Sequence, residues 1–277
     1  MTENTGTFIL LSKRGVVMSF EIILLLAFVQ SATEFLPVSS SGHLALMDTL
    51  GISNQNLLMD IALHVGTLIA VCAFFSKDII ALLTGFWRKG FEQKLGISLI
   101  IATLPALIVG FVFENIIETV FRSPVIIAYT SIFYGLLLWI TDKFSPKSKK
   151  LVQITYLHAF YIGLAQALAL IPGTSRSGIT MTCARFLGYQ RTDSAKFSML
   201  LSIPVIGLGA GYMFIKAFLE NELSTDIGLQ IGIGVIAAAI FGLFAVWFLM
   251  RWLKTASFAV FAGYRIILGI ILLFLFV

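Results

Sequence analysis

The chain has 277 residues, of which 58% are hydrophobic and 12% are charged, and its formal net charge is +5. Soluble domains carry about 25% charged residues, so this composition excludes a water-soluble globular protein and indicates an integral membrane protein. Long apolar runs between short charged loops predict an all-α protein, because a β-barrel would show only weak alternation of apolar residues. The positive charges lie in those loops, so no nucleic-acid partner is expected.

The N-terminal segment has a basic pair before an apolar run but no small-residue cleavage site, so we expect it to be retained. Met18 is an alternative start, which makes residues 1–17 a predicted unstructured extension. Two repeats of one membrane domain, 18–150 and 151–277, are expected to follow.

The first repeat is predicted to contain one re-entrant hairpin and three spans. The apolar segment 20–36 is short for a span and stops at a proline, so with the return at 44–50 it predicts a helical hairpin. The second repeat starts with a similar segment, 151–170, and a return at 181–187. The six predicted spans are 61–75, 97–113, 124–140, 197–219, 227–250 and 256–277.

Lys and Arg are distributed unequally between the loops. The loops 77–94, 142–150, 185–196 and 251–254 hold 4, 4, 3 and 2 of them, whereas 48–60, 114–123 and 220–226 hold 0, 1 and 0. This asymmetry predicts that the first set is cytoplasmic. The first hairpin would then enter from outside and the second from inside.

The two halves resemble each other in three places and in the same order, which predicts an inverted-topology repeat. The clearest match pairs LPVSS-SGH at 36–43 with IPGTSRSGI at 171–179, if Arg176 is an insertion. Irregular backbone at membrane depth is tolerated only where it is buried in protein or lines a cavity. We therefore expect the polar segments 30–43 and 171–180 to face each other.

These two polar segments, the first and second motifs below, carry three ionisable residues in an apolar chain: Glu34, His43 and Arg176. Such residues are costly in a membrane and usually functional. Arg176 beside a helix start suits an oxyanion. Neighbouring groups that could bind the substrate are Gln30, Ser39, Ser41, Gly173, Thr174, Ser175, Ser177 and Thr180.

The same residues suggest a phosphoryl-transfer reaction. Glu34 with Gln30 one turn earlier could hold Mg²⁺ or Ca²⁺, since hard cations take oxygen ligands. Ser40 or His43 could attack phosphorus while the other manages the proton. Structural interpretations also apply, since serines and glycines are common packing residues in membranes and Glu34 could simply pair with Arg176.

Other polar residues are expected to be structural. His64 and His158 have no polar cluster nearby, and Arg265 and Lys216 are expected to extend from span ends to the interface. Cys72 and Cys183 are expected to be small core residues.

The segments QSATEFLPVSSSGH and PGTSRSGIT together closely resemble the undecaprenyl-diphosphate phosphatase family associated with bacitracin resistance. The resemblance covers nearly the whole chain from about residue 19. It implies that Glu34, Ser40 and His43 are catalytic, that Arg176 binds the diphosphate, and that Ser175 and Thr180 assist. Where the family has Glu or Gln at its first motif position, this chain has Gln30, so Glu34 is the stronger metal ligand.

The resemblance further implies hydrolysis of a C55 lipid diphosphate to the monophosphate carrier, which recycles it for cell-wall synthesis. The site would open to the outer face of the bacterial cytoplasmic membrane. The expected partners are this polyprenyl diphosphate, membrane lipids and a second copy of the chain in a homodimer. A transporter or lipid flippase is the alternative, because inverted repeats with opposed hairpins also suit alternating access.

Overall fold

The computed structural model describes residues 18–49, 51, 57–120, 123–219 and 228–276, without the side chains of Ser41, Ala45, Asp48, Thr49 and 114–120. The predicted extension 1–17 and the predicted loop 220–226 lie outside the described residues. The helices in chain order are α2 (Phe20–Phe35), α3 (Ser40–Thr49), α4 (Leu57–Phe74), α5 (Ser76–Gly85), α6 (Phe91–Val120), α7 (Pro124–Phe144), α8 (Tyr156–Ala167), α9 (Arg176–Phe186), α10 (Arg191–Leu219), α11 (Gly228–Trp252) and α12 (Ala259–Phe276). Two 3₁₀ turns, Leu151–Gln153 and Leu168–Leu170, flank α8.

The all-α prediction and the number of predicted spans are confirmed. Within the described residues six helices are long and apolar enough to cross a membrane: α4, α6 over Phe91–Phe113, α7, α10, α11 and α12. Helices α2 and α8 have only 16 and 12 residues, which is short for a hydrocarbon core of about 30 Å at 1.5 Å per residue. The protein is therefore a multi-pass membrane protein.

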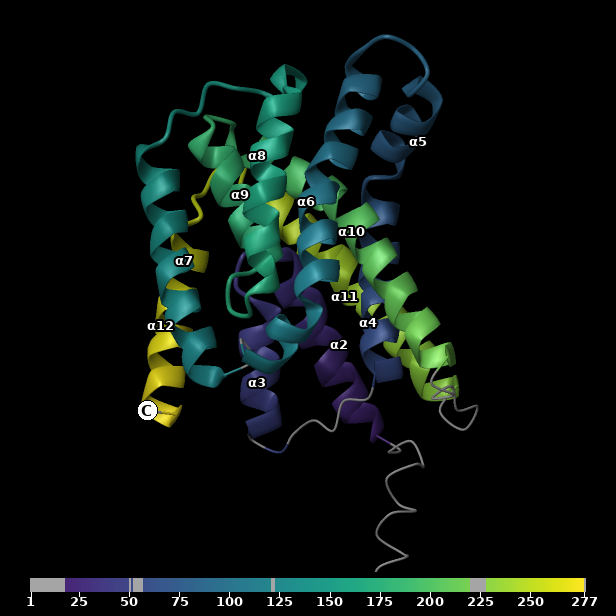
Figure 1. Cartoon of the computed structure of the whole chain (residues 1–277), viewed down its shortest axis with the longest axis vertical. Helices are drawn as coiled ribbons and strands as arrows, with labels where there is room; N and C mark the ends of the chain where they lie inside the picture. The colour runs from purple at the N-terminus through teal and green to yellow at the C-terminus, as the bar shows by residue number, and fades with distance from the viewer. Residues whose placement is uncertain (1–17, 50, 52–56, 121–122, 220–227, 277) are drawn as a thin grey trace, which may run out of the picture.

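The two short helical pairs lie in opposite halves of the bundle. In Figure 1, α8 and α9 lie in the upper half and α2 and α3 in the lower half. Helix α2 packs against α11, and α8 packs against α6. Glycines allow close approach: a Cβ on Gly66 of α4 would lie 2.5 Å from the Val235 carbonyl, and one on Gly163 of α8 would lie 2.7 Å from that of Ala102.

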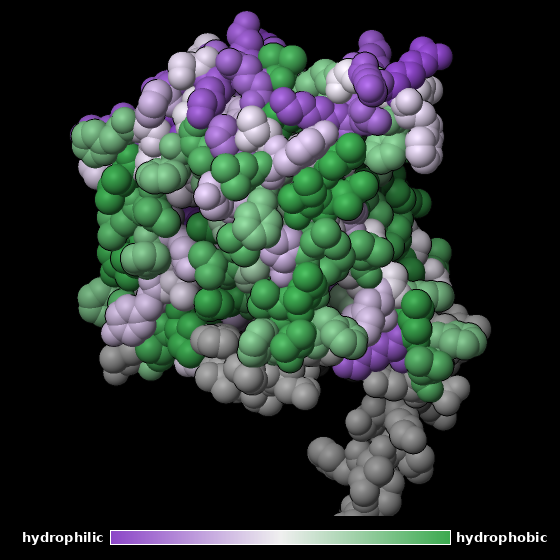
Figure 2. Space-filling view, turned by 45° about the horizontal axis from the view of Figure 1, so that its top comes forward, coloured by the Kyte–Doolittle hydropathy of each residue, from purple (hydrophilic) through white to green (hydrophobic). Residues whose placement is uncertain are grey.

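The basic loops are joined at one end of the molecule. Lys196 pairs with Asp78 at 2.6 Å, and Arg191 pairs with Asp142 at 2.8 Å. Arg191 also donates to the Ala256 carbonyl, and Asp142 accepts from the Phe258 amide. Figure 2 shows hydrophilic residues gathered along this upper end, with apolar residues over most of the face below.

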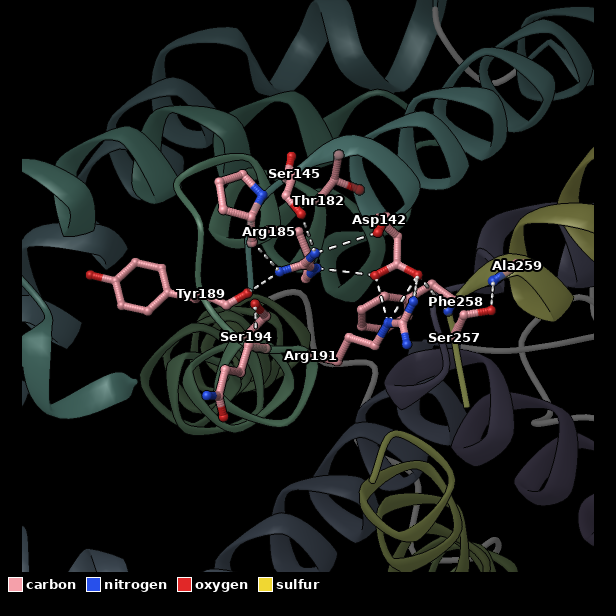
Figure 3. A network of polar contacts seen from close by, with 12 residues as sticks. Asp142, Ser145, Thr182, Arg185, Tyr189, Arg191, Ser194, Ser257, Phe258 and Ala259 are labelled. Carbon is pink, nitrogen blue, oxygen red and sulfur yellow. Dashed lines mark hydrogen bonds and ion pairs between the residues drawn. The ribbon is translucent and has the colours of Figure 1, made fainter. Parts of the chain in front are cut away.

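Three expectations about this end are wrong. The predicted loop 77–94 contains α5, whose ten residues begin directly after α4. Asp142 lies inside α7 and is buried, and Arg185 at the end of α9 is fully buried. Figure 3 shows the Arg185 guanidinium between the Asp142 carboxylate and the Tyr189 carbonyl, so these charges stabilise the fold instead of facing water.

Candidate active site

Each polar motif contains a turn with the same unusual backbone. Ser39 and Ser175 have φ values of 77° and 68°, the left-handed region that few non-glycine residues adopt. Helix α3 begins directly after Ser39, and α9 begins directly after Ser175. Aligned on this feature, Arg176 corresponds to Ser40. The alignment that made Arg176 an insertion is therefore wrong by one residue, and the extra residue belongs to the preceding turn.

The two motifs contact each other, as expected. Arg176 Nη2 lies 3.1 Å from Glu34 Oε1, and the two side chains are 12% and 11% exposed. Ser177 Oγ donates to the Leu36 carbonyl at 3.1 Å. A buried carboxylate and guanidinium in an apolar chain stabilise each other's charge. This ion pair and the Ser177 hydrogen bond link the first and second motifs.

Helix α10 fixes Arg176 from a third side. Arg176 Nη1 donates to the Ser198 carbonyl at 3.0 Å, and Thr180 Oγ1 lies 2.7 Å from Ser198 Oγ. The sequence analysis missed Ser198, because one serine in a long apolar span gives no signal of its own. Its contacts orient the guanidinium.

The second turn is held by backbone contacts. Ser175 Oγ accepts from the Gly178 amide at 3.1 Å and caps α9. Gly173 has φ +88°, and a Cβ there would lie 2.0 Å from Thr130 Oγ1, so this position requires glycine. Thr130 Oγ1 donates to the Pro172 carbonyl at 2.7 Å. These contacts fix the first turn of α9, which begins with Arg176. The helix N-terminus and the guanidinium therefore lie together, as an anion site requires.

Most of the remaining hydroxyl groups lie inside the protein. The serines and threonines that were predicted to bind substrate and are fully buried are Ser39, Thr174, Ser177 and Thr180. Ser40 is half-buried at the first residue of α3, and Ser41 has no described side chain. In this arrangement the buried hydroxyls support the two turns. Among the first-motif serines with a described side chain, Ser40 is the most accessible.

His43 is fixed by two hydrogen bonds. Nδ1 lies 2.7 Å from the Ser39 carbonyl, which can only accept, so Nδ1 carries the proton. In the neutral ring Nε2 then accepts, and the Tyr264 hydroxyl donates to it at 2.5 Å. The two rings stack with centroids 5.5 Å apart. Tyr264, on α12, was not predicted because a tyrosine in a membrane span is common.

Gln30 makes an unexpected contact with a histidine. His64 Nδ1 faces the Asp60 carbonyl at 2.8 Å, so its Nε2 accepts from the Gln30 amide nitrogen at 3.4 Å. The expectation that His64 has no polar neighbour is therefore wrong. This contact leaves the Gln30 amide oxygen as the atom that can face a cation. His158 also has a polar neighbour, since its Nδ1 lies 2.7 Å from the Tyr189 hydroxyl near the basic loops, and burial raises the pKa of Tyr189 to about 12.

The predicted cation ligands are few. Among the described residues no group of three His, Cys, Asp or Glu could hold a metal. Glu34 and Gln30 supply oxygen donors, which suit Mg²⁺ or Ca²⁺. Phosphate oxygens and water would have to complete the coordination.

Arg265 differs from its prediction. Instead of reaching an interface, it is fully buried on α12. Its Nη2 donates to the Gly173 carbonyl at 2.8 Å and to the Thr174 carbonyl at 2.7 Å. Helix α12 thus touches the first motif through Tyr264 and the second through Arg265.

Comparison with known proteins identifies the family of this chain. The model of the bacitracin resistance protein BacA family matches residues 23–271. The chain belongs to this family. The resemblance seen in its two motifs is thereby confirmed, and the BacA match extends over both motifs and the Tyr264–Arg265 pair.

Curated relatives carry the name undecaprenyl-diphosphatase. The protein of Alcanivorax borkumensis is 45% identical over 91% of this chain and 97% of its own length. Those of Saccharophagus degradans and Teredinibacter turnerae are 44% and 43% identical, over 88% and 90% of this chain and 93% and 97% of theirs. These relatives match this chain over most of their own length.

Proposed function

We propose that this chain is an undecaprenyl-diphosphatase, which hydrolyses undecaprenyl diphosphate to undecaprenyl phosphate and inorganic phosphate. The observation that carries the proposal is Arg176, which lies at the start of α9 and against Glu34 of the first motif. A guanidinium at a helix N-terminus favours a phosphate group through both charge and free N–H groups. End-to-end similarity to proteins with this activity supports the same substrate.

In the proposed mechanism Arg176 binds the diphosphate and Ser40 attacks the terminal phosphorus. The bond from that phosphorus to the bridging oxygen breaks, and undecaprenyl phosphate leaves. Water then cleaves the phosphoserine and releases inorganic phosphate. His43 takes the Ser40 proton in the first step, which requires its Nε2 to exchange the Tyr264 hydroxyl for Ser40.

The alternative mechanism makes His43 the nucleophile and Ser40 the proton donor. Rapid denaturation in detergent at neutral pH during turnover, which preserves both phosphoserine and the acid-labile phosphohistidine, followed by mapping of the phosphorylated residue, separates the two mechanisms. A phosphoserine at residue 40 supports the first and a phosphohistidine at residue 43 the second. A label on neither residue would contradict both covalent mechanisms.

Glu34 and Gln30 would hold a divalent cation through the carboxylate and the amide oxygen. When bound, such an ion neutralises phosphate charge and orients the phosphoryl group. Glu34 also holds the Arg176 guanidinium, with Nη2 at 3.1 Å. Phosphate release that continues unchanged after chelation and dialysis would contradict this role.

The proposed topology has two re-entrant hairpins, α2–α3 and α8–α9, related by an inverted repeat. Two helix contacts support it. Helix α2 of the first repeat packs on α11, the second span of the second repeat, and α8 of the second repeat packs on α6, the second span of the first. The basic loops joined at one end would be cytoplasmic. The first hairpin then opens outward, which places the site toward the extracytoplasmic side. A homodimer stays a prediction.

Purified protein in detergent, supplied with undecaprenyl diphosphate, tests the function. We expect one inorganic phosphate per lipid and undecaprenyl phosphate as the lipid product. The same protein in vesicles tests the transporter alternative by following lipid accessibility. Lipid movement without phosphate release would overturn the proposed hydrolase and favour a flippase.

A further inference from the structure

Buried donors without partners are concentrated at one place in this protein. Six buried side-chain nitrogen and oxygen atoms of the described residues make no hydrogen bond with other described residues. Four of them are Thr174 Oγ1, Arg176 Nε, Arg265 Nε and Arg265 Nη1. All four can donate, and all lie in the second motif or on the arginine that contacts it. Buried donors normally find acceptors, so a cluster of unpaired ones calls for an explanation.

Arg265 is the unexplained part of that cluster. Its guanidinium is fully buried and contacts the Gly173–Thr174 carbonyls through Nη2 alone. A Cβ added to Gly178 would lie 2.6 Å from Nη1, so the guanidinium lies against the first turn of α9. It therefore stands behind the same helix start at which Arg176 faces Glu34.

The charge of Arg265 is also uncompensated. None of the ion pairs found in the described part of the chain includes it, whereas Glu34 is already paired with Arg176. A buried cation without an anion costs several kcal/mol, about the penalty of desolvating one ion. Burial shields it from water, so an anion bound at the adjacent turn would interact with it strongly.

We propose that Arg265 is a positioning residue that sets the second turn for the diphosphate and supplies the positive charge that the bound diphosphate neutralises. The inference rests on the proposed function, because it names the diphosphate as the anion. Arg265 acts through the turn: its two carbonyl contacts hold Gly173 and Thr174, and the α9 start and Arg176 face the substrate. A purely structural clamp would need the two carbonyl contacts but not the uncompensated charge.

Two substitutions in the full-length protein separate charge from geometry. Arg265→Met removes the charge and keeps an unbranched apolar side chain, whereas Arg265→Lys keeps the charge and loses the planar fork. The measurements are kcat and KM for phosphate release, inhibition by inorganic pyrophosphate, and the melting temperature. Arg251→Met, at an exposed arginine near the end of α11, is the control and should change none of them.

For Arg265→Met we expect KM and the pyrophosphate inhibition constant to rise by about tenfold or more, as for loss of a charge-assisted interaction. For Arg265→Lys we expect the inhibition constant to stay within about threefold of the original and kcat to fall, since the turn loses its two-carbonyl support. Unchanged KM and inhibition constants in Arg265→Met, with only a lower melting temperature, would overturn the proposal. Failure of both variants to fold would overturn it too, because the arginine would then serve the fold.

The proposed function can fail separately. If the unmodified protein releases no phosphate from the lipid, the hydrolase assignment fails. Binding of inorganic pyrophosphate to the unmodified protein and to Arg265→Met, by calorimetry, then still tests the anion role. Equal affinity of the two proteins, or no binding to either, would overturn it.

Discussion

Two fully buried arginines lie at opposite ends of helix α9 and have different surroundings: Arg185 belongs to its last turn, and Arg265 of α12 lies against its first turn. Arg185 pairs with Asp142 at 3.1 Å and donates to the carbonyls of Pro146 and Ser145 at 3.0 and 3.2 Å (Figure 3). Arg265 has two carbonyl contacts and two unpaired nitrogens. The first arrangement is complete within the described residues, and the second leaves two donors for the anion that we propose to bind there.

This difference distinguishes the residues that stabilise the fold from the residues that serve the proposed activity. A compensated ion cluster joins α7, α9 and α10 at the basic end, whereas uncompensated donors gather at the turn that meets the first motif. Substitutions at the basic end should therefore lower stability, and substitutions at the turn should lower activity.

The largest expected effect on stability is that of Asp142→Ala. The substitution leaves Arg185 buried without its carboxylate and removes the bidentate partner of Arg191, which should cost about 3–5 kcal/mol. Thermal unfolding in detergent measures it. A melting temperature close to that of the unmodified protein would show that the basic end does not hold the fold.

Gly178→Ala should disturb the other end. The new methyl group would lie 2.6 Å from Arg265 Nη1, and overpacking of this kind costs about 1–3 kcal/mol. We expect about 1.36 kcal/mol of this cost to appear in the activation free energy, which lowers the rate of phosphate release about tenfold. Gly209→Ala is the matched control, since a Cβ there meets nothing within 4 Å. Equal activity of the two variants would contradict the contact.

Tyr264→Phe should have a smaller effect on kcat. It removes the hydroxyl that donates to His43 Nε2 but keeps the stacked ring. Because His43 Nε2 must exchange this hydroxyl for Ser40, loss of one hydrogen bond of about 0.5–1.5 kcal/mol predicts an increase in kcat of up to about tenfold with little change in KM. Single-turnover kinetics would measure it, and a change confined to KM would place Tyr264 in lipid binding instead.

The smallest expected effect is that of Asp78→Ala. Its pair with Lys196 is partly exposed on both sides, at 37% and 30%, and such pairs contribute about 0–1 kcal/mol. Unfolding of this variant beside Asp142→Ala compares a surface pair with a buried cluster. A loss as large as that of Asp142→Ala would remove the distinction between them.

The sequence predicted the spans because they are long apolar runs. It predicted both motifs because ionisable residues in an apolar chain are costly and therefore conspicuous. It could not predict Ser198, Tyr264 or Arg265, each a single polar residue in a long apolar helix. Their partners lie far away in sequence: Arg265 contacts carbonyls 92 and 91 residues earlier. Arg185 was counted as a loop charge because its buried carboxylate, Asp142, is visible only in the folded chain.

Phosphate release by Arg176→Ala tests the account most directly, because Arg176 joins the two motifs and faces the proposed phosphate site. Loss of a charged donor from such a site lowers kcat by about 10²–10³-fold or more. We predict this loss for undecaprenyl diphosphate in a variant that stays folded and helical, as measured by circular dichroism, although the unpaired Glu34 lowers its melting temperature. Near-normal release by the folded variant would contradict the claim that the two motifs form one catalytic site.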